Sequence, residues 1–98
     1  MIYRSLHPVA SLRKYMALKK PLVINQPEIG NLIRELRIEL GLTQEQFAAE
    51  LGVVYPTVNR WENGHAQPSP MAMKQIKRML QDLGEQGQTL LQQHLAEE

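Results

Sequence analysis

Two short segments that meet at a glycine constrain the fold of this chain more than any other feature of its sequence. In the first, Thr43 is followed three residues later by Gln46, and these residues are the two ends of a capping box that starts a helix. Gly52 ends that helix, because glycine tolerates the left-handed conformation that a tight turn needs. We therefore expect a short helix over about 44–51, followed by a sharp change of direction.

The second segment is a short helix with an apolar inner face. Val54, Val58 and Trp61 recur at helical spacing and share one side, and Gly64 is a typical helix end. Where two such helices cross steeply, the first needs a small residue, which Ala48 supplies. The inner faces are completed by Phe47, Leu51 and Val53. Two short helices joined in this way are the material of a helix-turn-helix motif.

The rest of the sequence also favours helices. Proline, glycine and asparagine divide it into short pieces, and only Leu22–Asn25 looks extended. The further helices are expected at about 9–20, 26–40, 70–83 and 88–96. The second of these begins either with a capping box of Asn25 and Glu28, or with Gln26 as the cap and Pro27 in the first turn. The predicted fold class is all-α.

Composition limits the kind of protein and its location. The chain has 98 residues, enough for one modest core, and no cysteine, which excludes disulfides and thiolate–metal sites. No apolar run is long enough to span a bilayer, and the N-terminus lacks the pattern of a signal peptide. We expect a cytoplasmic protein without membrane contact. Residues 1–27 carry five bases and no acid, whereas 28–98 carry six bases and ten acids, so a basic N-terminal extension could meet phosphates.

Three sequence patterns lie close together in the middle of the chain. R-x-x-x-G-L-T-Q begins at Arg37, A-x-x-L-G-V begins at Ala48, and V-x-x-W-E-x-G-x-x-x-P begins at Val58. Together they resemble the DNA-binding domain of phage-repressor-type regulators, the Xre/Cro family, over about 29–80. This resemblance implies a five-helix helix-turn-helix domain at 28–83, which binds double-stranded DNA, usually as a homodimer. The 1–27 extension remains outside it, as does a C-terminal helix within 84–98 that could serve dimerisation.

The resemblance also implies roles for individual side chains. Gln44 matches a glutamine that contacts phosphate beside the major groove, and the helix at 55–63 matches the recognition helix. On that helix Arg60 suits guanine and Asn59 suits adenine. The expected DNA-binding residues are Gln44, Tyr55, Pro56, Thr57, Asn59, Arg60, Asn63 and His65, with Gln67 in the same loop. Arg37 and Glu62 match a partly buried structural ion pair.

The sequence departs from the family pattern in two places. Val54 stands where Ser, Thr or Asp normally caps the recognition helix, and Pro56 compensates in part by removing an amide that needs capping. Pro56 and Tyr55 could contact a thymine methyl or a sugar instead. The recognition helix also offers only one cation, Arg60, so the basic segment 4–20 is the expected second source of phosphate contacts.

Other kinds of site are not indicated. The histidines have no metal-ligand spacing, and we expect surface positions for His7, His65 and His94. We expect the methionines Met71, Met73 and Met79 to serve helix packing. There is no nucleophile motif or phosphate loop, so we predict neither enzyme activity nor a cofactor.

Three functions remain open on the sequence. The first is a sequence-specific transcriptional regulator, a repressor that binds an inverted-repeat operator as a dimer. The second is an antitoxin that represses its own operon and neutralises a toxin protein through an extension. The third is a protein-interaction module without DNA binding. The leucines beyond a minimal helix-turn-helix favour dimerisation, or else they only cover the domain's own core; they are Leu80, Leu83, Leu90, Leu91 and Leu95.

Overall fold

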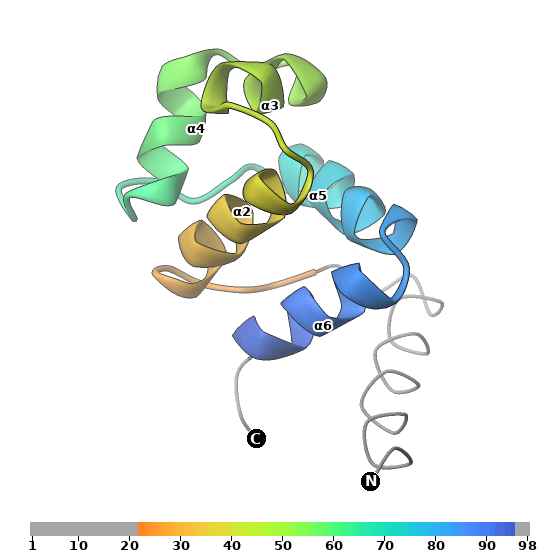
Figure 1. Cartoon of the computed structure of the whole chain (residues 1–98). Helices are drawn as coiled ribbons and strands as arrows, with labels where there is room; N and C mark the ends of the chain where they lie inside the picture. The colour runs from red at the N-terminus through yellow and green to blue at the C-terminus, as the bar shows by residue number, and fades with distance from the viewer. Residues whose placement is uncertain (1–21, 96–98) are drawn as a thin grey trace, which may run out of the picture.

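The chain folds into a group of short helices, as a computed structural model that describes residues 22–95 shows (Figure 1). The helices are α2 (Glu28–Glu39), α3 (Gln44–Leu51), α4 (Tyr55–Glu62), α5 (Pro70–Asp82) and α6 (Glu85–His94). No strand occurs in this part of the chain. The predicted all-α class is confirmed, while the helix expected at 9–20 lies outside the described residues.

Helix α2 is the centre of the fold. It packs against α4 on one side and against α6 on the other, while α3 packs on α4 and α5 on α6 (Figure 1). The apolar spacing predicted for α2 explains its central position, because apolar residues on two faces of the helix are buried against its neighbours. The fully buried side chains of the core are Ile29, Leu32, Ile33, Leu36, Phe47, Val58, Ile76, Leu80 and Leu91.

The turn between α3 and α4 follows the prediction. The Thr43 hydroxyl accepts from the Gln46 amide at 3.0 Å, and the Gln46 side chain accepts from the Thr43 amide at 2.9 Å. Gly52 has φ +71°, in the left-handed region, and Ala48 is buried where the helices meet. The start and the end of α3 are thus fixed by local interactions.

The start of α2 differs from both sequence alternatives. Pro27 occupies the N-cap position, so neither Asn25 nor Gln26 is the cap residue. Gln26 still serves the helix from one position earlier: its Oε1 accepts from the Gly30 amide at 3.0 Å. Its Nε2 donates to the carbonyls of Trp61 and Ala66 at 2.9 and 2.7 Å, so one side chain joins α2 to the end of α4.

Helix α6 begins at Glu85, three residues earlier than expected, so it includes a glycine. Gly84, at φ +66°, precedes the helix, and Gly87 lies inside it. A side chain at 87 would collide with the backbone carbonyl of Leu80, so glycine lets α5 and α6 approach closely. The close contact between the two helix backbones therefore explains why glycine occupies position 87.

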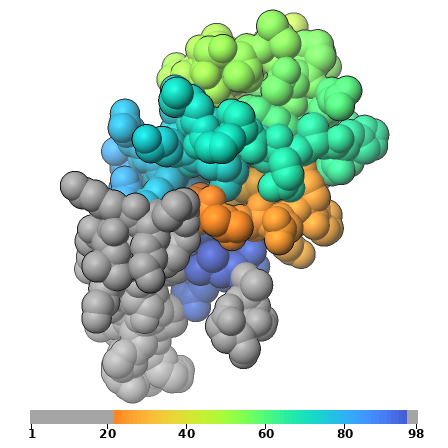
Figure 2. All heavy atoms as spheres, turned by 180° about the vertical axis from the view of Figure 1, so that it is seen from behind, coloured from red at the N-terminus to blue at the C-terminus, as the bar shows by residue number. Residues whose placement is uncertain are grey.

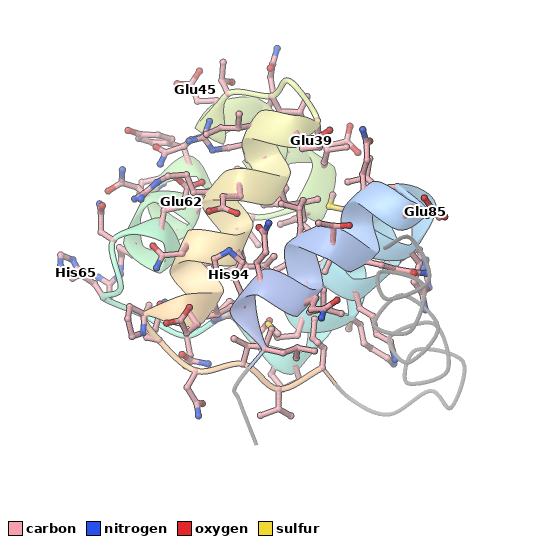
Figure 3. All side chains as sticks on the ribbon, turned by 60° about the horizontal axis from the view of Figure 1, so that its bottom comes forward. Glu39, Glu45, Glu62, His65, Glu85 and His94 are labelled. Carbon is pink, nitrogen blue, oxygen red and sulfur yellow. The ribbon has the colours of Figure 1, made fainter. Side chains whose placement is uncertain are left out.

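His94 is not the surface residue that the sequence suggested. It is buried between α6 and α2, where its Nδ1 lies 3.3 Å from Glu28 Oε1 and its Nε2 lies 3.0 Å from Glu35 Oε1 (Figure 3). The two carboxylates belong to residues almost two turns apart on α2, so the imidazole bridges them. This contact fastens the last described helix to the central one.

The methionines and C-terminal leucines divide between core and surface. Met73 is buried and Met79 packs against the core, but Met71 is 69% exposed, so the expected packing role is wrong for that residue. Leu80 and Leu91 are fully buried within the domain. Leu83, Leu90 and Leu95 are only partly buried against its core. Among residues 22–95, no helix has both the length and the apolar character that a membrane span requires.

Candidate nucleic-acid interface

Helix α4 has a buried side and an exposed side. Val58 and Trp61 are buried in the core, while Tyr55, Pro56 and Arg60 are exposed. The inner position expected for Val54 is wrong: it precedes the helix as its N-cap and is 66% exposed. Seen from behind, the end of α4 and the loop after it form a projecting edge of the molecule (Figure 2). A helix held by one side at the edge of a domain is suited to enter the major groove of DNA.

Arg60 is the available cation on this edge. Its side chain makes no ion pair or hydrogen bond with any residue in 22–95. Its backbone carbonyl accepts from the His65 amide at 2.8 Å, which fixes the loop after α4. His65 itself is exposed and points away from the body (Figure 3). The guanidinium is therefore free to bind a phosphate or a base edge.

Glu62 is the last residue of α4, and it is buried. Its carboxylate accepts from Arg37 Nε at 2.7 Å and from Arg37 Nη2 at 3.1 Å, so the ion pair is bidentate. The hydrogen bond with Glu62 raises the pKa of Arg37, against the opposing effect of burial. Arg37 Nη1 also donates to the Leu42 carbonyl at 3.0 Å, so the pair ties α4 to the end of α2 and the turn after it.

A second arginine on α2, which the sequence reasoning missed, also reaches Glu62. Arg34 Nη2 donates to the Glu62 carbonyl at 2.9 Å, and its Nε lies 3.6 Å from the carboxylate. Arg34 precedes Arg37 by three residues, so both arginines lie on neighbouring positions of one helix face. This spacing of the two arginines was the sequence signal that could have identified Arg34 as a second partner of Glu62.

Gln44 connects the buried ion pair to the exposed side of α4. Its Nε2 donates to Glu62 Oε1 at 2.9 Å, and its Oε1 accepts from Asn59 Nδ2 at 3.2 Å. Asn59 Oδ1 in turn accepts from Asn63 Nδ2 at 3.1 Å. We call the series Arg37, Glu62, Gln44, Asn59 and Asn63 the polar chain. It holds three of the expected DNA-binding side chains by bonds within the protein.

Gln67 is occupied elsewhere. Its Oε1 accepts from the Gln26 amide at 3.1 Å, and its Nε2 donates to the Ile24 carbonyl at 3.3 Å. These bonds hold residues 22–26 against the loop between α4 and α5. The side chain therefore serves the fold of this loop, and its expected position beside the DNA backbone stays a prediction.

The edge carries little positive charge. Arg60 is the only base on α3 and α4, whereas Glu45 and Glu50 are exposed there. Glu45 projects outward from α3 (Figure 3). The basic segment expected to supply further cations, 4–20, lies outside the described residues. Within the described part of the chain, no group of three His, Asp or Glu side chains is arranged to hold a metal ion.

Comparisons with known proteins agree with this geometry. A helix-turn-helix family model matches residues 33–83. A propionyl-CoA carboxylase regulator from Cereibacter sphaeroides is 40% identical over 55 residues, which are 56% of this chain and 11% of that protein. An uncharacterized HTH-type transcriptional regulator from Methanothermobacter thermautotrophicus is 47% identical over 49 residues, which are 50% of this chain and 71% of that protein.

The chain thus spans about a tenth of the first relative and most of the second. No solved structure matches it significantly. The family match extends over more than half of the chain and includes α3, the turn at Gly52 and α4. The chain therefore belongs to the helix-turn-helix family of the Xre/Cro type.

Proposed function

We propose that this member of a DNA-binding regulator family is a sequence-specific repressor that binds an inverted-repeat operator as a homodimer. One observation carries the proposal: α4 buries Val58 and Trp61, while Arg60 on the same helix is exposed and free of partners among residues 22–95. A free guanidinium on an exposed helix is the side chain that most often reads guanine in the major groove.

The other contacts follow from the arrangement of the edge. Gln44 stands at the first position of α3 and still has one amide hydrogen for a phosphate oxygen. Asn63 and His65 are exposed at the end of α4 and in the loop after it, where they can meet the backbone. Asn59 is half-buried, and its amide is held at both ends within the polar chain, which weakens its expected role as an adenine reader.

The dimer belongs to the same proposal. Helix α6 lies on the far side of α2 from α4, so two copies joined there would leave both recognition helices uncovered (Figure 1). The partly buried Leu83, Leu90 and Leu95 supply apolar contacts for this role. Successive major grooves on one face of DNA are about 34 Å apart, and the two α4 helices would need that spacing.

Selection of bound sequences from random duplex DNA by the full chain tests the proposal. We expect an enriched inverted repeat with half-sites one helical turn apart. Enrichment of a single asymmetric site would contradict the dimer, and no enrichment at all would contradict sequence-specific binding.

A protein-interaction module is the second candidate. It is favoured by the exposed charge of α3 and α4, which consists of two acids, Glu45 and Glu50, and one base, Arg60. Binding that weakens steeply with salt separates the two, because DNA binding releases counterions from phosphates. The antitoxin function combines both candidates and requires a toxin that binds the same chain; it stays a prediction.

A further inference from the structure

An open groove lies where the ends of α2, α3 and α5 meet (Figure 1). Its volume is about 360 Å³, and the residues that line it are Leu40, Leu42, Glu50, Met79, Asp82 and Leu83. The four apolar side chains are only partly buried against the core, so the groove leaves apolar surface in contact with solvent. No residue of α4 lines it, so it is separate from the candidate nucleic-acid interface.

The charged side chains of the groove are both acids. Glu50 and Asp82 are exposed, and neither forms an ion pair with a residue in 22–95. The lining contains no base to offset them. Carboxylates beside apolar surface favour a partner that offers cations and apolar side chains together, and they repel nucleic acid and acidic proteins.

The chain itself carries a segment of this chemistry outside the described residues. Residues 9–20 contain four bases and no acid. Its apolar residues Leu12, Tyr15 and Met16 are three and four positions apart, which is the spacing of neighbours on one helix face. The segment therefore combines cations with an apolar stripe, as the groove requires.

The described chain also begins on the side of the molecule that bears the groove. Residues 22–26 run back beneath α2, so Leu22 lies toward the side on which α5 ends (Figure 1). Leu22 is buried in the core, and only Pro21 separates it from the segment. A segment joined to its site by so short a connection is present at a high effective concentration.

We propose that the groove is the docking site of the chain's own segment 9–20. The apolar side chains of the segment occupy the groove, and its bases pair with Glu50 and Asp82. Exposed ion pairs are individually weak, so the apolar contacts and the short connection supply most of the affinity. DNA phosphates would compete with the two carboxylates for the same bases.

A spin label on the segment tests the proposal in the full chain. The sequence has no cysteine, so Ser11→Cys provides a single attachment site for a nitroxide and keeps all four bases. The nitroxide broadens amide NMR signals, and the effect falls steeply with distance. We expect the strongest loss of signal at the groove, at Leu42, Glu50 and Leu83, and a much weaker loss at Thr89.

Reversal of the groove charges identifies the carboxylates as the cause. In the labelled chain, the double variant Glu50→Lys, Asp82→Lys keeps the apolar lining and should lose the strong broadening at the groove. The double variant Glu45→Lys, Glu85→Lys reverses two exposed acids that do not line the groove, so it is the matched control and should keep the broadening. The dispersion of the amide signals shows whether each variant is folded.

Two results would overturn the proposal. One is broadening that is strongest away from the groove, or that persists at the groove in the Glu50→Lys, Asp82→Lys variant. The other comes from a mixture of spin-labelled chain with isotopically enriched, unlabelled chain: broadening at the groove there would show that a second copy supplies the segment. The experiment contains no DNA, so its result is independent of the proposed DNA-binding function.

Discussion

Gln44 Nε2 donates to Glu62 Oε1 at 2.9 Å, so one buried carboxylate serves both the fold and the proposed interface. Arg37 occupies the same carboxylate from the other side, at 2.7 Å. The position of Gln44 at the start of α3, and through it that of Asn59 on α4, depends on an ion pair beneath the surface. We therefore expect stability and DNA binding to be coupled at Glu62.

Glu62→Gln should weaken both properties. The substitution keeps the shape of the side chain but leaves the Arg37 charge without its partner, and loss of one member of a buried pair costs about 3–5 kcal/mol. We expect a loss of this order in the free energy of unfolding, measured by denaturant titration. Glu50→Gln, at an exposed site on α3, should change it by less than about 0.5 kcal/mol. Equal effects of the two variants would contradict the structural role of Glu62.

Arg60→Ala should reduce DNA binding without loss of stability, because the side chain is exposed and unpaired in the described part of the chain. A bidentate contact with guanine is worth about 1–3 kcal/mol, and its loss relaxes the preference at one base pair. Fluorescence anisotropy at several salt concentrations measures both effects. Arg78→Ala removes the same charge from an exposed position on α5 and is the matched control. A uniform loss for all sequences would instead assign Arg60 to a phosphate.

Gly87→Ala should destabilise the domain by about 1–3 kcal/mol, the usual cost of overpacking. The added methyl group would collide with the Leu80 carbonyl, and α6 would have to move away from α5. Thermal unfolding measures the loss. Thr89→Ala, on the exposed side of the same helix, should have little effect. Equal unfolding temperatures for the Gly87 variant and the unmodified chain would show that the two helices tolerate separation.

His94→Ala should loosen α6 on α2. The variant loses the imidazole contacts with Glu28 and Glu35 and some buried area, and we expect a cost of about 1–2 kcal/mol. Amide hydrogen exchange should accelerate more in α6 than in α3. Gln93→Ala, at the exposed neighbouring position, provides the comparison. Unchanged exchange in α6 would mean that its leucines alone hold it.

Val54→Ser should raise stability, which is unusual for a substitution in a binding surface. Serine at the N-cap can accept from an amide of the first turn, a gain of about 1 kcal/mol that valine cannot supply. The unfolding temperature should rise, whereas Val23→Ser, at a similarly exposed valine outside a helix start, should leave it unchanged. A lower unfolding temperature for the Val54 variant would show that the valine is held by contacts in the free protein.

Local sequence patterns predicted the helix-turn-helix. Contacts between residues far apart in the sequence could not be predicted in this way. The capping box at Thr43 and the left-handed Gly52 act within a few residues, so their signals are visible in the sequence. The partners of His94 lie 59 and 66 residues away, and no local pattern identifies them. The same limit applies to Gln67, whose bonds reach more than 40 residues back along the chain.

At the candidate site, the sequence predicted the exposure of some side chains better than it predicted their contacts. Arg60 and Tyr55 are exposed, as a helix with Val58 and Trp61 inward requires. The sequence did not indicate that Gln44 and Asn59 bond to each other, because that contact depends on the crossing of α3 and α4. Amide side chains suit many partners, and only the packed structure selects among them.

The backbone contact between Gly87 and Leu80 has a consequence for operator geometry. Where helices meet through long side chains, changes of rotamer can absorb small displacements, but here no side chain lies between the two backbones at that point. If two copies join through α6, we expect the distance between their α4 helices to change little. A single base pair inserted at the centre of the operator would then be rejected rather than accommodated.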